Sequence, residues 1–412
     1  MIQIIAPKLP INCSINLSGS KSISNRLLLL RQILDLKIEI KNLSDSEDTK
    51  ILLKALRQIK EEKNKNINVF DAGTDMRFLT ALLAIKKGKW TITGSDRMKK
   101  RPIGKLVSAL KSLGAEIKFL EKKDYPPLEI KGKILLGGIL KIDASQSSQF
   151  ISALLLIAPK LKNGLILTLK NRIVSSPYIE MTVALLKKFK VPISKHKNTY
   201  TVNSNSKSKQ INKIKIESDW SSASYWYSIC ALSKNAIIEL NFLNKISLQS
   251  DSILPELYKK LGVETKYKKN SIIIYQKKLK IKSINYDFIN CPDIAQTFAV
   301  TCFGLGVCAK LIGLSTLKFK ESDRIIALKT ELEKMGAKLA ITNNSIELKK
   351  SKPILFKGIV ETYKDHRMAM SFTPLALVYK SIKIANPDIV SKSYPRFWKD
   401  LKSVGFSVNL CS

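Results

Sequence analysis

Long apolar runs are missing from this sequence of 412 residues. No stretch of eighteen consecutive apolar residues occurs, so we expect no transmembrane helix. The opening MIQIIAPKLPINCSINL has no basic start, long apolar stretch or cleavage site, so we expect no signal peptide. Cysteine is also scarce, because the six residues form no CxxC pair and most stand in apolar surroundings. These absences predict a soluble cytoplasmic protein with reduced thiols, no disulfides and no metal site.

Acidic residues and arginines are few. The chain has 33 acidic and 71 basic residues, a formal net charge of +38, and only ten of the basic residues are arginine. The lysines are scattered in KK pairs beside Asn and Ile, which is typical of an AT-rich genome. A basic nucleic-acid-binding protein is the alternative, but it predicts lysines clustered on one face with exposed aromatics, and aromatics make up only 7%. We therefore expect no specific nucleic-acid partner. The retained arginines instead suggest bidentate recognition of small anions.

A repeated unit organises the chain. Six lysine-free apolar helices each follow a Ser, Thr or Asp turn, at steps of 54, 73, 72, 74 and 72 residues. They begin at Ser20, Thr74, Ser147, Asp219, Asp293 and Asp365. Helices that are apolar all round are expected to be buried, with each Ser, Thr or Asp as the cap of its helix.

A second, amphipathic helix follows in each unit and ends in a glycine turn before a β-rich segment. Gly114, Gly262, Gly336 and Gly405 hold that position, whereas Lys190 replaces the glycine in the third copy. Six units predict an α/β fold of two similar domains with three units each. We place one domain at residues 20–218 and the other at residues 1–19 plus 219–412, which gives the first strand to the second domain.

Ten motifs, in this order over nearly the whole chain, carry a resemblance to a known family. They are GSKSISNR, DAGTDMRFL, RPIG, SSQF, SPYIEMT, DWSSASY, PDIAQT, KESDRI, TYKDHRMAM and KSYP. The chain resembles the 5-enolpyruvylshikimate-3-phosphate synthases, which are enolpyruvyl transferases. The resemblance implies two domains, each of three βαβαββ units with buried parallel helices (an inside-out α/β barrel), and an active site in the cleft between them. It also implies a monomer without cofactors that transfers the enolpyruvyl group of phosphoenolpyruvate to shikimate 3-phosphate, on the route to aromatic amino acids.

The resemblance also assigns roles to the residues of these motifs. Shikimate 3-phosphate would be bound by Lys21, Ser22, Arg26, Ser147, Ser148, Gln149, Ser175, Tyr178, Asp293 and Lys320. Phosphoenolpyruvate would be bound by Lys21, Gly73, Arg101, Gln149, Arg324, His366, Arg367 and Lys392. The catalytic candidates are Asp293, Glu321 and Lys21. Three arginines and two lysines around one ligand would repel each other, so we expect the free protein to stay open and to close when anions bind.

The chain departs from the family's pattern at a few positions. Asp71 and Asp75 flank the AGT loop, where they are expected to weaken phosphoenolpyruvate binding. Gly73 is retained, so we expect inhibition by glyphosate, which occupies the phosphoenolpyruvate site in this family. The nearest alternative is UDP-N-acetylglucosamine enolpyruvyl transferase, which shares fold and chemistry. That family typically carries a reactive cysteine in the loop that here reads TGSDRMKKRPIG, which has none.

Overall fold

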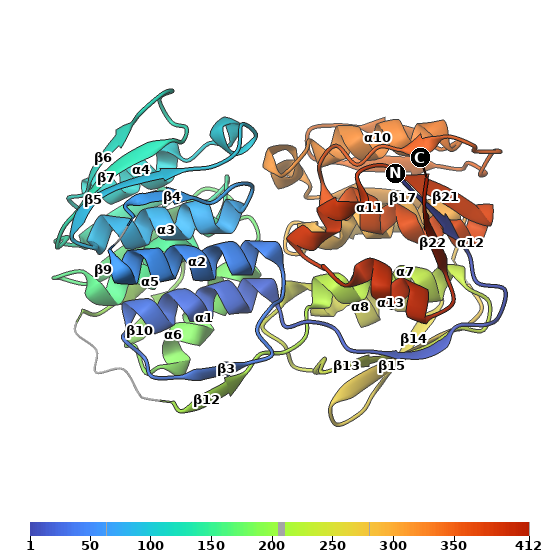
Figure 1. Cartoon of the computed structure of the whole chain (residues 1–412), viewed down its shortest axis with the longest axis horizontal. Coiled ribbons are helices and arrows are strands. Elements are labelled where there is room, and N and C mark those ends of the chain that lie inside the picture. The colour runs from blue at the N-terminus through green and yellow to red at the C-terminus, as the bar shows by residue number, and fades with distance from the viewer. Residues whose placement is uncertain (63, 205–210, 280, 412) are drawn as a thin grey trace. The chain divides into compact units, whose positions relative to one another are not determined.

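The computed structural model describes residues 1–62, 64–204, 211–279 and 281–411 and divides into two compact units (Figure 1). The N-terminal unit is Lys21–Ile216. The C-terminal unit combines Met1–Ser20 with Glu217–Ser412. Each unit has its own hydrophobic core, and the two cores share no residue.

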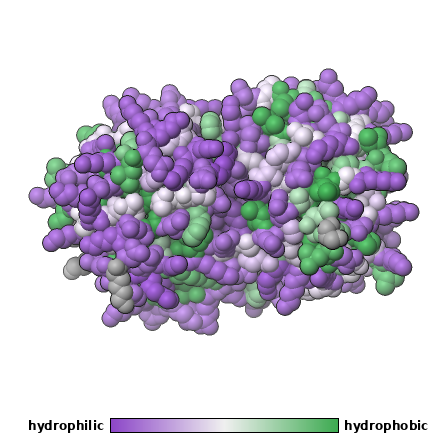
Figure 2. Space-filling view, turned by 45° about the horizontal axis from the view of Figure 1, so that its top comes forward, coloured by the Kyte–Doolittle hydropathy of each residue, from purple (hydrophilic) through white to green (hydrophobic). Residues whose placement is uncertain are grey.

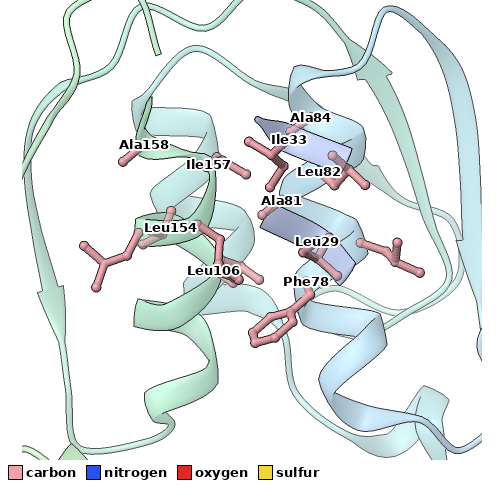
Figure 3. Packing of buried hydrophobic residues seen from close by; sticks show 14 of the residues in the cluster. Leu29, Ile33, Phe78, Ala81, Leu82, Ala84, Leu106, Leu154, Ile157 and Ala158 are labelled. Carbon is pink, nitrogen blue, oxygen red and sulfur yellow. The ribbon is translucent and has the colours of Figure 1, made fainter. Parts of the chain in front are cut away.

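Three parallel helices form the core of the N-terminal unit. They are α1 (Lys21–Ile33), α3 (Gly73–Ile85) and α5 (Ser148–Ile157). Figure 3 shows their apolar side chains interdigitating, with Phe78 and Leu82 of α3 among those of α1 and α5. A hydrogen bond joins the first turns of two of these helices, since the side chain of Gln149 in α5 donates to the Thr74 hydroxyl in α3. The helix starts of this unit therefore lie at one end of its core.

Sheets and lysine-bearing helices cover this core. One sheet has the order β4-β5-β7-β6 and another β10-β11-β9-β8, while β3 and β12 form a parallel pair. The strands are β3 (Glu39–Lys41), β4 (Asn66–Asn68), β5 (Gly88–Thr93), β6 (Glu116–Phe119), β7 (Leu128–Gly132), β8 (Gly138–Asp143), β9 (Leu165–Lys170), β10 (Ile193–His196), β11 (Thr199–Val202) and β12 (Lys213–Lys215). The outer helices are α2 (Glu47–Glu61), α4 (Gly104–Ser112) and α6 (Ser176–Lys188).

The C-terminal unit repeats this design around α7 (Trp220–Leu232), α9 (Ala295–Gly304) and α11 (His366–Phe372). Ser224 lies 3.4 Å from Thr297, and four residues further along both helices Thr301 bonds Ser228 at 2.7 Å. A register that advances equally on both helices requires α7 and α9 to be parallel. The apolar segments, which contain no lysine other than Lys21 at the start of α1, are thus buried helices, as the sequence predicts.

Three four-stranded sheets surround these helices, in the orders β14-β15-β13-β2, β16-β17-β19-β18 and β20-β21-β1-β22. The strands are β1 (Ile2–Ile5), β2 (Asn12–Ile15), β13 (Ile237–Asn241), β14 (Val263–Tyr267), β15 (Ser271–Gln276), β16 (Ser283–Asp287), β17 (Cys308–Ile312), β18 (Lys338–Ile341), β19 (Ile346–Lys349), β20 (Ile359–Val360), β21 (Ser381–Ile384) and β22 (Ser407–Leu410). Helices α8 (Leu254–Lys259), α10 (Arg324–Lys334), α12 (Ala376–Tyr379) and α13 (Phe397–Ser403) complete the unit.

The first core helix of each unit follows a strand that belongs to the other unit. The strand before α1 is β2, yet β2 pairs with β13 of the C-terminal unit. The strand before α7 is β12, yet β12 pairs with β3 of the N-terminal unit. The two-stranded β3-β12 sheet lacks the hairpin that four of the other five sheets contain, so the first repeat, with its step of 54 residues, is shorter by that hairpin.

Turn geometry follows the predicted glycine positions. Gly114, Gly262, Gly336 and Gly405 have φ between 82° and 101°, the region that favours glycine. Lys190, which replaces glycine in the third copy, adopts the same left-handed conformation with φ of 57°.

The prediction that Thr74 caps its helix is wrong, because Ala72 is at the N-cap of α3 and makes no side-chain cap. Instead, the Thr74 hydroxyl accepts a hydrogen bond from the side chain of Gln149.

Candidate functional site

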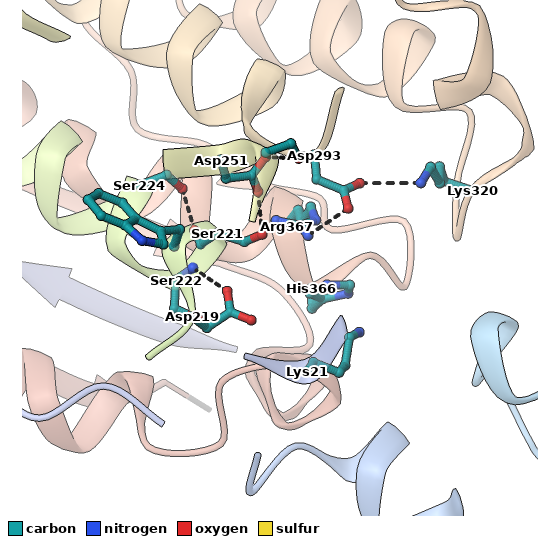
Figure 4. A network of polar contacts seen from close by, with 12 residues as sticks. Lys21, Asp219, Ser221, Ser222, Ser224, Asp251, Asp293, Lys320, His366 and Arg367 are labelled. Carbon is teal, nitrogen blue, oxygen red and sulfur yellow. Dashed lines mark hydrogen bonds and ion pairs between the residues drawn. The ribbon is translucent and has the colours of Figure 1, made fainter. Parts of the chain in front are cut away.

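Four elements of the C-terminal unit bring charged side chains together (Figure 4). A 3-10 turn before α9 carries Asp293, and the loop before α10 carries Lys320 and Glu321. The α10 start supplies Arg324 and the α11 start supplies Arg367. These are the retained arginines and acids of three separate motifs, and the fold places them in one network.

Arg324 is the centre of this network. The residue is 1% exposed, and its guanidinium contacts three carboxylates. The Nε group bonds Asp365 at 2.7 Å, Nη2 bonds Glu321 at 2.9 Å, and Nη1 lies 3.3 Å from Asp293. Burial alone would lower the pKa of Arg324, but Asp365 and Glu321 more than offset it and the pKa is raised. Arg324 therefore stays charged in a site with little solvent.

The sequence predicts that Asp293 caps its helix. In the structure its side chain instead lies among three cations. Its oxygens are 3.3 Å from Lys320, 3.3 Å from Arg324 and 3.2 Å from Arg367. Burial opposes its ionisation, yet Arg367, Lys320 and Arg324 hold the pKa of Asp293 well below its usual value. Burial and the neighbouring arginines lower the pKa of Lys320 in turn. Asp293 is thus an ionised carboxylate whose basicity depends on where the cations sit.

Two more predicted residues complete the network. Lys392 is 4% exposed, and its Nζ is 3.9 Å from Glu321. His366 is 1% exposed, and its Nδ1 is 3.8 Å from Asp365. The carboxylate of Asp365 caps α11 by accepting from the Arg367 amide at 3.0 Å, so one buried acid fixes both arginine-bearing helices.

Arg26 of α1 is the buried cation of the N-terminal unit. Its Nε donates to Thr182 at 2.8 Å, and its Nη2 donates to Ser152 and to the Tyr178 carbonyl, both at 3.1 Å. Nη1 donates to the Ser22 carbonyl at 2.9 Å. All of these partners are neutral, and desolvation lowers the pKa of Arg26 to about 10. A buried guanidinium held by neutral partners favours an anion nearby.

Lys21 begins α1 and is held by an acid that the sequence analysis did not assign. Its Nζ is 2.7 Å from Asp48 of α2, whose side chain is 5% exposed. The neighbouring Asn25 donates to Asp75 at 2.8 Å and accepts from Thr49. Both Asp48 and Asp75 are therefore buried beside the first turns of α1 and α3.

Gly73 and Arg101, which belong to different motifs, touch. A methyl group on Gly73 would lie 2.5 Å from Nη1 and 2.6 Å from Nη2 of Arg101. Arg77 fixes this arrangement, because its guanidinium donates to the Gly73 carbonyl at 3.1 Å and to the Pro102 carbonyl at 3.0 Å. The close approach requires glycine at position 73.

The remaining predicted residues lie at helix starts of the same unit. Ser147 caps α5 by accepting from the Gln149 amide at 3.2 Å, and Ser148 is the first residue of that helix. Ser175 precedes α6 in a left-handed conformation with φ of 52°. Free amide groups at such helix starts are suited to binding phosphate.

Acidic side chains neutralise several of the predicted anion-binding cations. Asp365, Asp293 and Glu321 contact Arg324, and Asp48 contacts Lys21. Asp365 and Asp48 stand in the sequence as ordinary acids near helix starts, so no local signal identifies them as partners. Their role depends on contacts across 41 and 27 residues of chain.

The hydropathy of the helices and of the molecular surface points to no functional residue beyond those named above. No helix in the described ranges is long and apolar enough to cross a membrane. Hydrophilic side chains cover most of the face in Figure 2 and separate the apolar ones into small groups.

Comparisons with known proteins identify one enzyme family. The family model of EPSP synthase (3-phosphoshikimate 1-carboxyvinyltransferase) matches residues 5–71 and 61–401. A 3-phosphoshikimate 1-carboxyvinyltransferase of Bacteroides fragilis is 43% identical over 412 residues, which cover 100% of this chain and 99% of the relative. A protein of the same name from Buchnera aphidicola is 39% identical over 419 residues, covering 95% and 94%.

Solved structures show the same fold. An EPSP synthase structure from Acinetobacter baumannii superposes with a TM-score of 0.79 at 21% identity, covering 100% of both chains. The mixed sheets and buried helices described above therefore form the two-domain α/β fold of the enolpyruvyl transferases. With the family model matching nearly the whole chain and full-length relatives above 30% identity, this chain belongs to the EPSP synthase (3-phosphoshikimate 1-carboxyvinyltransferase) family.

Proposed function

We propose that the network around Arg324 in the C-terminal unit and the groups around Lys21, Arg26 and Arg101 in the N-terminal unit together carry out the family's reaction. In that reaction the enolpyruvyl group of phosphoenolpyruvate moves to the 5-hydroxyl of shikimate 3-phosphate, and phosphate is released. The observation that carries the proposal is the ionised Asp293 held by Lys320, Arg324 and Arg367. Such a group supplies both the cations that two anionic substrates need and the base that the chemistry needs.

Both units would contribute residues to the binding of the two substrates. Arg26, Ser22, Ser147, Ser148, Ser175 and Tyr178 supply hydroxyls, helix starts and a buried cation for shikimate 3-phosphate. Lys21, Gly73, Arg101 and Gln149 of the N-terminal unit would bind phosphoenolpyruvate together with Arg324, His366, Arg367 and Lys392 of the C-terminal unit.

Substrate binding would also activate the base. In the free protein three cations hold the Asp293 pKa far too low for efficient proton abstraction. When substrate carboxylate and phosphate groups draw Arg324 and Arg367 toward themselves, the pKa of Asp293 rises toward its ordinary value. The base would thus become effective only in the ternary complex.

The steps then follow. Asp293 accepts the proton of the 5-hydroxyl as that oxygen attacks C2 of phosphoenolpyruvate, and C3 gains a proton from Glu321 or Lys21. The departing phosphate carries away the hydroxyl proton that Asp293 holds. The freed carboxylate of Asp293 then takes a proton from the new methyl group, and this proton returns to Glu321 or Lys21. Glu321 contacts Arg324 at 2.9 Å, which keeps it beside the reacting atoms.

The test offers the protein phosphoenolpyruvate with either shikimate 3-phosphate or UDP-N-acetylglucosamine and identifies the product by mass spectrometry. We expect an enolpyruvyl ether of shikimate 3-phosphate only. An enolpyruvyl product of the nucleotide sugar would overturn the proposal in favour of the related transferase.

A further inference from the structure

Asp251 is a buried acid behind the transfer site that none of the assigned roles uses. It lies in a 3-10 turn, Ser250–Ile253, just before α8 and is 2% exposed. One carboxylate oxygen accepts a hydrogen bond from Ser221 in the first turn of α7. The other oxygen lies 3.3 Å from the Ser250 hydroxyl. Both partners are hydroxyl groups, which can accept a hydrogen bond from a neutral acid as well as donate to a carboxylate.

The charged and titratable groups around Asp251 come from three elements. Asp293 faces it from the turn before α9 and Arg367 from the start of α11, while Asp219 caps α7 and Cys291 precedes Asp293. Figure 4 shows Asp251 beside Asp293, with Ser221 and Arg367 next to them. Arg367 is therefore the one cation in this set, and it already contacts Asp293 at 3.2 Å.

Burial and this surrounding charge disfavour ionisation of Asp251. Burial, and then the negative charge of Asp293, raise the pKa of Asp251 to about 7. The neutral acid is thus the main form at pH 6, and the carboxylate becomes common at pH 8. Ionisation would add a second negative charge that competes with Asp293 and with the substrate for Arg367.

We propose that Asp251 is a positioning residue of the transfer reaction: as a neutral acid it leaves Arg367 available to Asp293 and phosphoenolpyruvate, and as a carboxylate it draws Arg367 away. The inference rests on the proposed function and names a pH dependence built into the same site. Asp251 touches no reacting atom, so its effect is exerted through Arg367.

The test compares the wild type with Asp251→Asn, which has the shape of the neutral acid but cannot ionise. The measured quantity is kcat/KM for phosphoenolpyruvate from pH 5.5 to 8.5, at saturating shikimate 3-phosphate. The ratio of variant to wild type should rise by about three- to tenfold between pH 6 and pH 8. A ratio that stays constant with pH would overturn the proposal, because a purely structural role lowers activity equally at every pH.

A second variant keeps the test decisive if Asp251→Asn does not fold. The Ser221 hydrogen bond lowers the pKa of Asp251, so Ser221→Ala should shift the wild-type decline to higher pH. An unshifted decline in Ser221→Ala would also count against the proposal. Asp388→Asn, an exposed acid of the same unit, is the control and should keep a constant ratio. Wild-type protein without activity at any pH would contradict the proposed function, whereas an active enzyme with a constant ratio contradicts only the role of Asp251.

Discussion

At the scale of single residues, the site depends on residues, such as Gly73 and Arg324, that cannot be replaced by another residue type without losing a contact. Gly73 leaves space that the Arg101 guanidinium fills, and Arg324 serves three carboxylates with one planar group. The motifs DAGT and ESDR predict that Gly73 and Arg324 are functional residues. The acids that hold Arg324 and Lys21, which are Asp365 and Asp48, could not be predicted, because their partners lie 41 and 27 residues away.

Gly73→Ala should displace the Arg101 guanidinium, since the added methyl group would lie 2.5 Å from Nη1. We expect KM for phosphoenolpyruvate to rise about tenfold, with little change in KM for shikimate 3-phosphate. Steady-state kinetics with each substrate varied in turn measures both. Gly114→Ala is the matched control, because its methyl group would meet nothing within 4 Å and its φ of 101° affects stability rather than binding. Equal effects of the two variants on KM would contradict this account.

Arg324→Lys should be far from conservative. A lysine cannot donate to Asp365, Glu321 and Asp293 at once, so at least one buried carboxylate would lose its partner. We expect kcat to fall at least about a hundredfold and the free energy of unfolding to fall by about 3 kcal/mol. Kinetics and urea unfolding of the purified variant check both. The exposed exchange Arg172→Lys should leave both values unchanged.

At the scale of elements, the repeat predicts the buried and outer helices, but its caps are used differently. Ser147, Asp219 and Asp365 do cap their helices, whereas Thr74 and Asp293 turn their side chains to other partners. The spacing of residues cannot distinguish a capping side chain from one that contacts another element, because an Asp before a helix has the same sequence pattern in both cases. The pairing of β2 and β12 also leaves no local signal, since their partner strands lie more than 170 residues away in the chain.

Helix α9 contains a polar side chain that its core does not satisfy. Gln296 is 0% exposed, and neither its amide nitrogen nor its oxygen has a hydrogen-bond partner among the described residues. Leaving such groups unbonded costs about 1 to 3 kcal/mol. Gln296→Met, similar in length, should therefore increase the free energy of unfolding by about 1 kcal/mol or more. A lower urea midpoint for the variant would show that Gln296 is satisfied in solution.

At the scale of the whole molecule, stability should depend on pH through acids shifted in opposite directions. The lowered pKa of Asp293 stabilises the fold at pH values above its unfolded pKa of about 4, and this contribution is lost in more acidic solution. The raised pKa of Asp251 has the opposite sign. Between about pH 4 and pH 7 the folded protein retains a proton that the unfolded chain has lost, so stability falls as pH rises.

Asp251→Asn should remove this second effect. We expect its urea midpoint, relative to that of the wild type, to increase from pH 5 to pH 8. A relative midpoint that does not change over this interval would mean that Asp251 ionises at its ordinary pKa. Because both proteins share every other titrating group, the comparison isolates the one acid.

The net charge of +38 proves uninformative about function, since the residues that matter are compensated locally by buried acids. The ten motifs were sufficient to predict the family and the two-domain fold. They were not sufficient to predict how the free protein neutralises its own anion-binding groups.

The most direct test of the central claim, that Asp293 and its cations perform the transfer, is phosphate release in a single turnover. The wild type should release one phosphate per enzyme only when phosphoenolpyruvate and shikimate 3-phosphate are both present. Asp293→Asn, which removes the base but keeps the side chain's shape, should slow that release at least about a thousandfold. Phosphate release from phosphoenolpyruvate alone, or an Asp293→Asn variant as fast as the wild type, would contradict the account.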